Sequence, residues 1–461
     1  MDLGRVRRNV PVAQDGRPPN IVILMLDTTR IDCLGCYGST NGVTPRIDEL
    51  ATESVVFEQA VTPEPLTRPA VSTMLTGLYP RTHGVDTNRK KLADQFTTLP
   101  EVLSDNGYVT GGFMSAAVLS SFYGTGQGFD TYVGPAEGTW ELSRMTAVAK
   151  LYYSAVNRSA RLFEMPGGKT VERAATWIDN NRQRPFFAFV HLFDPHFPYD
   201  PPPEHDFAAR EGFTGIRAPY SDPLVRFEPG FEMPDDYLEM MWLKYRGEVS
   251  YTDECVGRML DALDSMGLAD DTIVVLVSDH GESFEKGFYF AHGTRLFDSL
   301  VRVALMVRYP GLEEPHRVSG QVLLTDLYPS LLAMLDLPVE DDIQGRDVFT
   351  TRGGANADSV RPVFLQTDFE NAEPNRARMS LGVRTPEWKY VVSPELDLTE
   401  LYDLVNDPTE VVNLVDTRPE MRGRFAGLLS DWTAETEQNV RPVEELSPER
   451  LEALRALGYV Q

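Results

Sequence analysis

Lysine is scarce in this chain. Only 7 of its 43 basic residues are lysines, and its 69 acidic residues leave a formal net charge of −26. An acidic, lysine-poor surface fits a high-salt cytoplasm, where screening weakens the repulsion between like charges. It equally fits an acidic enzyme encoded by a GC-rich genome, and composition does not separate the two. In both cases the charge disfavours nucleic acids and anionic membranes as partners.

Cysteine and long apolar runs are also scarce. The three cysteines include a lone Cys33-x-x-Cys36 pair, without the second pair or the histidines that a zinc site requires. No apolar run approaches the roughly 18 residues of a membrane span. Arg7-Arg8 is followed by a proline-bounded stretch, residues 11–19, instead of the apolar segment of an export signal. We therefore expect a cytoplasmic protein without a disulfide framework, and the oligomeric state cannot be read from the sequence.

The chain does contain short, continuous apolar runs that end in polar residues. With 461 residues it is long enough for a large core and two domains. The runs at 21–26, 185–190 and 272–278 are typical of buried parallel strands. Ligands bind at the carboxyl ends of the strands in such sheets. Asp27 and the pair Asp279-His280 directly follow two of the runs and are candidate metal ligands. Asp27 has an alternative reading as the cap of a following helix.

Between the first two runs, residues 67–84 predict a loop that enters a short helix. Thr67 is a good N-cap, Pro69 is tolerated only in a first helical turn, and Gly77 supplies a C-terminal cap. The start of such a helix presents backbone N–H groups and a positive dipole end, which suit a bound anion. Taken alone, Thr67 is better explained as a cap with no other role, because such caps are common.

The order of these segments resembles the sulfatase family, within the alkaline phosphatase superfamily. The resemblance runs from about residue 20 to about residue 415. The matching segments are Asp27–Asp32, Pro69, Leu75-Thr76-Gly77, Tyr79-Pro80, His83-Gly84, Asp194-Pro195-His196 and Asp279-His280. Three positions depart from the family pattern. Thr67 stands where the family has the cysteine that becomes formylglycine, Val71 stands where it has an arginine, and Thr28 stands where many members have a second aspartate.

The resemblance implies an α/β fold of the alkaline-phosphatase type. We expect a large mixed, mostly parallel sheet flanked by helices, followed by a smaller C-terminal α+β subdomain. The expected division is an irregular leader at 1–19, a catalytic domain at 20–350, and a C-terminal subdomain at 351–461. That subdomain is expected to hold a small antiparallel sheet and a terminal helix at 447–457.

The resemblance also assigns roles to individual residues. One divalent cation, Ca²⁺, Mn²⁺ or Mg²⁺, is expected on Asp27, Asp279, His280 and Thr67, because hard oxygen donors with one imidazole suit these ions. Thr67 is the expected nucleophile, and no formylglycine is expected. His196 is the candidate general acid, with a structural loop histidine as the alternative. Asn88 and His292 are expected to bind the anionic oxygens of the substrate, although Asn88 fits a turn residue equally well.

Three functions remain open for such a site. The first is a metal-dependent sulfatase-like hydrolase of small-molecule or saccharide sulfate esters. The second is a phosphodiester or phosphonate hydrolase, or a phospho-transferase, that uses Thr67. The third is a non-catalytic anion-binding relative, since Thr28 and Val71 remove groups that the family normally has. A threonine ester cannot break its own C–O bond as a formylglycine hydrate does, so water would have to attack sulfur or phosphorus directly.

Overall fold

The computed structural model describes residues 11–13, 16–135, 164–213, 232–285, 288–350, 361–370 and 377–437. Its largest element is a nine-stranded sheet in the order β11-β2-β10-β6-β1-β5-β3-β4, with β9 paired to β2. The strands are β1 (Asn20–Leu26), β2 (Val55–Val61), β3 (Val109–Phe113), β4 (Thr131–Val133), β5 (Phe186–Leu192), β6 (Thr272–Ser278), β9 (Arg302–Val303), β10 (Leu305–Arg308) and β11 (His316–Leu323).

Strand β1 lies in the middle of this sheet and is parallel to both of its neighbours, β5 and β6. Strand β3 continues the parallel arrangement towards β4, and β11 is parallel to β2. Only β9 and β10 run antiparallel to their partners. The expected mixed, mostly parallel sheet is therefore confirmed, and the three apolar runs of the sequence are β1, β5 and β6.

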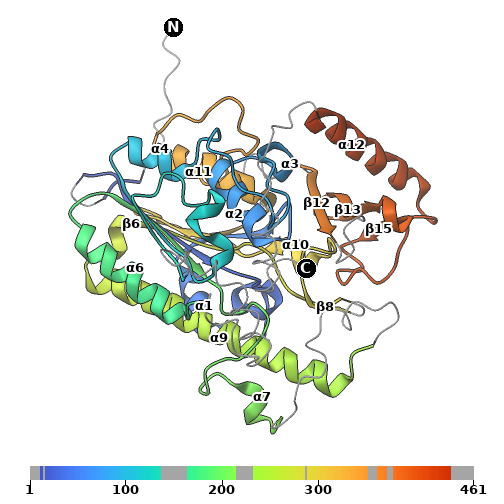
Figure 1. The fold of residues 1–461 in the computed structure, drawn as a ribbon, viewed down its shortest axis with the longest axis horizontal. Coiled ribbons are helices and arrows are strands. Elements are labelled where there is room, and N and C mark those ends of the chain that lie inside the picture. The colour runs from blue at the N-terminus through green and yellow to red at the C-terminus, as the bar shows by residue number, and fades with distance from the viewer. Residues whose placement is uncertain are drawn as a thin grey trace, which may run out of the picture.

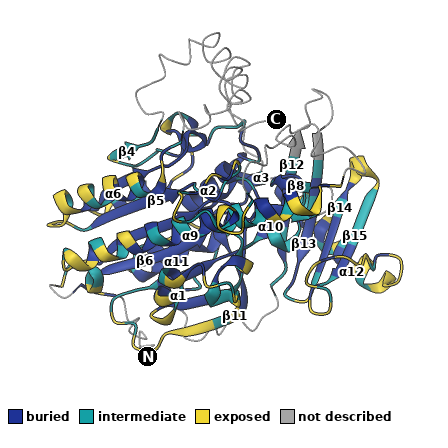
Figure 2. Cartoon of the chain, turned by 90° about the horizontal axis from the view of Figure 1, so that it is seen from below, coloured by how far each residue is buried: buried dark blue, intermediate teal, exposed yellow. Residues whose placement is uncertain are grey.

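Helices cover both faces of the sheet because the residues of β1 alternate between two cores. Val22, Leu24 and Leu26 pack with α1 (Pro45–Thr52), α6 (Gly167–Asn181) and α9 (Asp235–Ser265). Ile21, Ile23 and Met25 pack on the other face with α2 (Thr67–Thr76), α4 (Leu99–Asp105) and α11 (Leu327–Met334). Figure 1 shows the two helical layers, and Figure 2 shows their buried inner and exposed outer sides.

A second sheet of four antiparallel strands packs beside the first. Its strands are β12 (Val363–Glu370), β13 (Ala377–Arg384), β14 (Trp388–Ser393) and β15 (Leu398–Asp403). Helix α12 (Pro419–Glu437) covers this sheet, and Trp432 stacks on Phe364 with ring centroids 4.9 Å apart. A buried ion network at its base includes Lys389, whose Nζ lies 2.6 Å from Asp298 Oδ1 and 2.6 Å from Glu410 Oε1. The expected smaller antiparallel sheet is confirmed.

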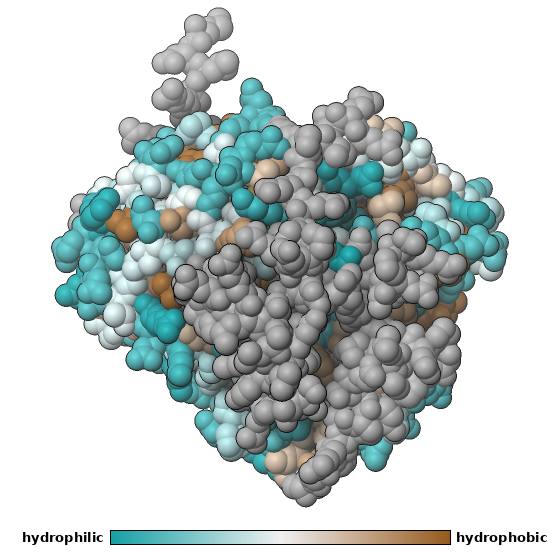
Figure 3. Space-filling model, in the orientation of Figure 1, coloured by the Kyte–Doolittle hydropathy of each residue, from teal (hydrophilic) through white to brown (hydrophobic). Residues whose placement is uncertain are grey.

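Two predictions about the C-terminal part of the chain, its terminal helix and its boundary, are not tested by the structure. The sequence did not predict α12, and the predicted helix at 447–457 lies outside the described residues. Residues 351–360, the expected boundary of the subdomain, also lie outside them, so the domain division stays a prediction. None of the helices in the described ranges has the length and hydrophobicity of a transmembrane segment. The described surface visible in Figure 3 is largely hydrophilic, with small hydrophobic areas.

The described residues also form several short elements. They are α3 (Pro80–His83), α7 (Phe207–Arg210), α10 (Asp298–Val301), and a small hairpin of β7 (Ser283–Glu285) and β8 (Phe288–Ala291). The hairpin follows β6 along the chain, and the chain returns to the main sheet at β9, after α10. The hairpin therefore carries the residues that follow Asp279-His280.

Candidate active site

Asp27 and Asp279 lie side by side because their strands do. Leu26 pairs with Ser278 at the carboxyl ends of β1 and β6. Asp27 and Asp279 are the residues that directly follow these two strand ends. Asp27, Asp279 and His280 are fully buried, and each offers a ligand atom within 4.8 Å of the other two. The structure thus brings together three of the side chains that the sequence predicts as cation ligands.

The carboxylates of this cluster have the character of a metal site. Asp27 Oδ2 lies 2.9 Å from His191 Nε2, and Asp279 Oδ1 accepts the backbone N–H groups of Thr28 (3.1 Å) and His280 (2.7 Å). Among the described residues, the second oxygen of each aspartate, Asp27 Oδ1 and Asp279 Oδ2, has no hydrogen-bond donor. Burial raises the pKa of Asp279 to about 8, and burial and nearby Glu282 raise the pKa of Asp27. Asp279 Oδ2 does lie 3.4 Å from His280 Nε2. Two buried carboxylates whose second oxygens accept no hydrogen bond are unfavourable unless a cation joins them, so these residues fit a divalent ion.

Thr67 directs its hydroxyl into this cluster. Thr67 Oγ1 lies 3.3 Å from His280 Nε2, and His280 Nδ1 lies 2.9 Å from the carbonyl oxygen of Gly281. Because Nδ1–H donates to that carbonyl, Nε2 is the acceptor for the Thr67 hydroxyl. The prediction that Thr67 is the N-cap is wrong by one residue: Leu66 is the N-cap, and Thr67 is the first residue of α2. Its side chain is therefore available to the site, while Gly77 ends the helix in the left-handed conformation as predicted.

His196 and His292 complete a row of three imidazoles with His280. The ring centroids of His280 and His292 lie 4.4 Å apart, and those of His292 and His196 lie 5.0 Å apart. His196 also stacks on Phe193 at 4.3 Å. Its Nδ1 lies 2.6 Å from the carbonyl oxygen of Phe197, so the opposite nitrogen, Nε2, is the one that can exchange a proton with a ligand. Burial and the neighbouring His292 lower the pKa of His196 to about 3.

Asn88 belongs to a loop that lies against the N-terminus of α2, where its side chain has a structural role. Its Oδ1 accepts the backbone N–H of Arg68 at 3.1 Å, which satisfies one of the donors at the helix N-terminus. Arg68 is itself fully buried and donates to the carbonyl oxygen of Val118 at 2.9 and 3.1 Å and to that of Asn88. Its guanidinium lies 3.5 Å from the ring centroid of Tyr123. Arg68 thus fixes the Asn88 loop to the helix that carries Thr67.

Two further residues near Asp27 carry roles that the sequence did not assign. His191, at the end of β5, pairs in register with Met25 and so reaches Asp27 across the sheet. Thr28 has a left-handed backbone with φ of 49°, which is strained for a β-branched residue. Tyr245 stabilises this turn, since its hydroxyl donates to the Thr28 carbonyl (2.7 Å) and accepts the Arg30 N–H (2.8 Å). The sequence could have indicated His191, because it is a polar residue near the end of an otherwise apolar strand. No local sequence feature distinguishes Tyr245 from the other residues of its helix.

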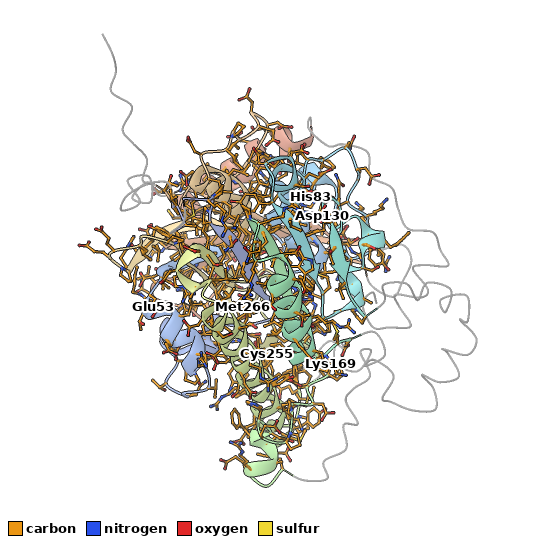
Figure 4. The ribbon with its side chains drawn as sticks, turned by 90° about the vertical axis from the view of Figure 1, so that its left-hand side faces the viewer. Glu53, His83, Asp130, Lys169, Cys255 and Met266 are labelled. Carbon is orange, nitrogen blue, oxygen red and sulfur yellow. The ribbon has the colours of Figure 1, made fainter. Side chains whose placement is uncertain are left out.

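The three cysteines are free thiols in other segments of the chain. Cys33 and Cys36 belong to two short 3₁₀ turns after β1, and Cys255 lies on α9, where Figure 4 shows it near the start of α6 and Lys169. Burial raises the pKa of Cys36 to about 12. Among the described residues, the cluster of possible metal ligands at the strand ends therefore contains no cysteine.

Comparison with known proteins places this site in a family. The family model described as Sulfatase matches residues 19–337, and one described as N-sulphoglucosamine sulphohydrolase, C-terminal, matches residues 285–428. An ulvan-active sulfatase of Formosa agariphila is 28% identical, over 97% of this chain and 86% of its own length. An N-acetylgalactosamine-6-O-sulfatase of Bacteroides thetaiotaomicron is 23% identical, over 90% of this chain and 93% of its own length.

Two solved structures share the fold across nearly the whole chain. The protein BT4656, solved in complex with its substrate D-glucosamine-2-N,6-O-disulfate, superposes with a TM-score of 0.73 at 19% identity, covering 92% of this chain and 99% of its own. The phosphonate monoester hydrolase of Agrobacterium radiobacter superposes with a TM-score of 0.70 at 22% identity, covering 91% of this chain and 96% of its own.

Proposed function

Because this chain belongs to the sulfatase family, whose members hydrolyse ester bonds, we propose that it hydrolyses sulfate esters through the hydroxyl of Thr67. The observation that carries the proposal is the placement of Thr67 Oγ1. It lies 3.3 Å from His280 Nε2, beside two buried carboxylates, at the first residue of a helix. A hydroxyl there meets a hydrogen-bond acceptor, and the anion that it attacks meets the helix N-terminus.

Asp27, Asp279, His280 and Thr67 would hold one divalent cation. When bound, such a cation increases the acidity of a hydroxyl and offsets the negative charge of the substrate. Their mostly oxygen donor set favours Ca²⁺, Mn²⁺ or Mg²⁺. Without a cation, His280 Nε2 accepts the hydrogen bond of Thr67 and so keeps the hydroxyl beside the two carboxylates; when a cation is held, that lone pair would serve as its ligand instead.

The side chains around Thr67 supply the remaining chemistry. The Thr67 hydroxyl gives its proton to solvent, its oxygen bonds to sulfur, and the S–O bond to the leaving alcohol breaks. His292 and the positive end of the α2 dipole stabilise the oxygens of the sulfuryl group, and Asn88 holds the neighbouring loop against that helix. His196 then gives a proton to the leaving oxygen. The free enzyme holds His196 neutral, so this role requires that the negative charge of the bound ester raise its pKa.

The second half of the reaction returns the enzyme to its starting state. Water attacks the sulfur of the threonine ester, sulfate leaves, and Thr67 recovers its hydroxyl proton. His196, which lost a proton in the first step, is placed to accept one from this water. A route through cleavage of the threonine C–O bond is closed, because threonine lacks the second oxygen that a formylglycine hydrate has.

The names of the relatives support a saccharide sulfate ester as the substrate class. Ulvan and N-acetylgalactosamine-6-O-sulfate are saccharide substrates of the relatives that bear those names. A phosphonate or phosphodiester substrate is the second candidate, because a neighbour in fold is a phosphonate monoester hydrolase and threonine suits direct attack on phosphorus.

The test is a panel of sulfate and phosphate esters, assayed with added Ca²⁺, Mn²⁺ or Mg²⁺. Thr67→Val keeps the shape of the side chain and removes the oxygen, so it should abolish turnover of every substrate found. Thr76→Val is the matched control, because that hydroxyl on the same helix bonds the backbone of Ser72 and Leu78. Trapping with a slow substrate should add one sulfuryl group to Thr67 and a phosphoryl group under the second candidate. Full activity of Thr67→Val would mean that water attacks directly, and no turnover on any ester would favour an anion-binding protein.

A further inference from the structure

A buried carboxylate beside the metal cluster has a defined pair of partners. The side chain of Glu282 is fully buried, and its Oε1 lies 3.1 Å from Nδ1 of His292. Its other oxygen, Oε2, accepts the hydroxyl of Tyr199 at 3.1 Å. The small hairpin explains the first contact: Glu282 immediately precedes β7, His292 immediately follows β8, and Ser283 pairs with Ala291 between them. Both carboxylate oxygens are therefore engaged within one hydrogen-bonded chain, Tyr199–Glu282–His292.

This arrangement determines which nitrogen of His292 meets the substrate. Nδ1 carries the hydrogen bond to Glu282, so the ring turns its Nε2 side away from that carboxylate. The ring lies between those of His280 and His196, at centroid distances of 4.4 and 5.0 Å. We propose that Glu282 is a positioning residue, which accepts the Nδ1–H of His292 and fixes the orientation of the ring so that its Nε2 side faces the ester. A proton on Nε2, which the bound anionic ester favours, then lets this side donate to the sulfuryl oxygens. This inference rests on the proposed function and deepens it.

Two other roles for Glu282 fit the structure less well. A direct contact with the substrate is unfavourable, because a carboxylate repels the anionic oxygens that the site must hold. A role as a cation ligand is not supported either. Within the part of the chain that the structure describes, the group with ligand atoms inside 4.8 Å comprises Asp27, Asp279 and His280, without Glu282. Glu282 thus acts on the substrate through His292.

The backbone around Glu282 is held firmly enough for such a role. Its carbonyl oxygen accepts a hydrogen bond from Arg30 Nη1 at 2.9 Å, and Arg30 is anchored by ion pairs to Asp32 (2.8 Å) and Glu285 (3.0 Å). The preceding residue, Gly281, donates its N–H to the carbonyl oxygen of Leu300 at 2.9 Å, and a Cβ there would lie 1.9 Å from the Ser299 carbonyl oxygen. Only glycine lets the backbone at residue 281 come this close to α10. The close contact and the hydrogen bond together fix the position of this segment against the helix.

A chain of polar groups of this kind has a measurable effect. When a partner that orients a functional histidine is removed, activity typically falls by about 10- to 100-fold. The chain also contains a matched pair outside the site: His205 Nε2 lies 2.9 Å from Glu254 Oε2 on the outer face of α9. The Glu254→Gln variant makes the same chemical change to a carboxylate–histidine pair that lies apart from the metal cluster and the three imidazoles.

The kinetic test is a double-mutant cycle on the best ester of the panel, with Glu282→Gln, His292→Gln and the double variant. Glu282→Gln alone should lower kcat/KM by about 10- to 100-fold. In the His292→Gln background the same change should cost less than about 2-fold, because the group that Glu282 positions is already absent. Glu254→Gln should leave kcat/KM unchanged. Equal losses from Glu282→Gln in both backgrounds would overturn the proposal, as would no loss in the wild-type background.

A second test needs no turnover and so separates this inference from the proposed function. NMR spectra of the full-length protein with ¹⁵N-labelled histidine are recorded in the presence of Mg²⁺. The chain has seven histidines, and the signals that disappear in His292→Gln are those of His292. The proposal requires a proton on Nδ1 of His292 in the wild type and a changed pair of ring-nitrogen shifts in Glu282→Gln. An unprotonated Nδ1, or shifts that Glu282→Gln does not move, would refute it. If every ester fails in the kinetic test, the proposed function falls, and these spectra still decide the role of Glu282.

Discussion

Replacing Asp279 by asparagine should make the metal-free protein more stable, although it removes a proposed ligand. The asparagine side chain would keep an oxygen to accept the N–H groups of Thr28 and His280, at the distances of 3.1 and 2.7 Å seen for Asp279 Oδ1. It would also replace the second oxygen, Oδ2, which has no hydrogen-bond donor among the described residues. The substitution therefore removes a buried negative charge and retains the hydrogen bonds.

The magnitude follows from the pKa of Asp279, which burial raises from the usual 3.8 to about 8. Because the folded state holds this proton more tightly than the unfolded state, stability falls as the pH rises from about 4 to about 8. At pH 7 the penalty is about 4 kcal/mol, and at pH 4 it is close to zero. Asp279→Asn should remove this pH dependence and recover up to that amount at pH 7.

Urea unfolding of the chelator-treated proteins, followed by circular dichroism at pH 5 and pH 7.5, measures both effects. Added Ca²⁺ or Mn²⁺ should narrow this difference between the variant and the wild type, because an ion at 100 times its Kd stabilises the wild type by about 2.7 kcal/mol, against the penalty of about 4 kcal/mol, and the variant by much less. Asp253→Asn is the matched control. Burial raises the pKa of Asp253 to about 6, but both of its oxygens accept backbone N–H groups, from Ile47 (2.8 Å) and Arg46 (3.2 Å), and asparagine can keep only one of these bonds. Asp253 is not part of the metal cluster, so added metal should stabilise this variant and the wild type by the same amount. A metal-free Asp279→Asn variant less stable than the wild type at pH 7.5 would refute the reasoning.

Three further predictions concern residues around the cluster. Arg68→Met should destabilise the fold by about 3 kcal/mol in urea unfolding and lower kcat/KM, because buried carbonyl groups lose their donor and the Asn88 loop loses its anchor; a change below about 1 kcal/mol would contradict this. Thr28→Gly should raise stability by about 1 kcal/mol, since glycine adopts a φ of 49° without strain, and a lower melting temperature would show that the hydroxyl matters more. His191→Ala should weaken metal binding about 10- to 100-fold in titration calorimetry, because it orients Asp27; unchanged affinity would rule out that role.

The sequence by itself determined the strands that build the site and the residues at their ends. Three continuous apolar runs predicted β1, β5 and β6, since a strand buried on both faces must be apolar throughout. Asp27 and Asp279-His280 follow two of these runs directly, and the carboxyl ends of neighbouring parallel strands meet at one edge of the sheet, so these residues were expected to lie together. The resemblance to sulfatases added Thr67, His196 and His292, and the structure brings all three around His280.

Only the tertiary structure decided how these side chains are supported, because the supporting contacts join residues far apart in the chain. His191 reaches Asp27 across 164 residues, and Tyr245 reaches Thr28 across 217. The exact start of α2 moved Thr67 from a cap to the first helical residue, and Asn88 proved to accept the Arg68 N–H. The link between Glu282 and His292 follows from the register of a short hairpin that has no strong apolar period. Local patterns report burial and chain direction, whereas hydrogen-bond partners depend on which segments the fold brings within about 3 Å of each other.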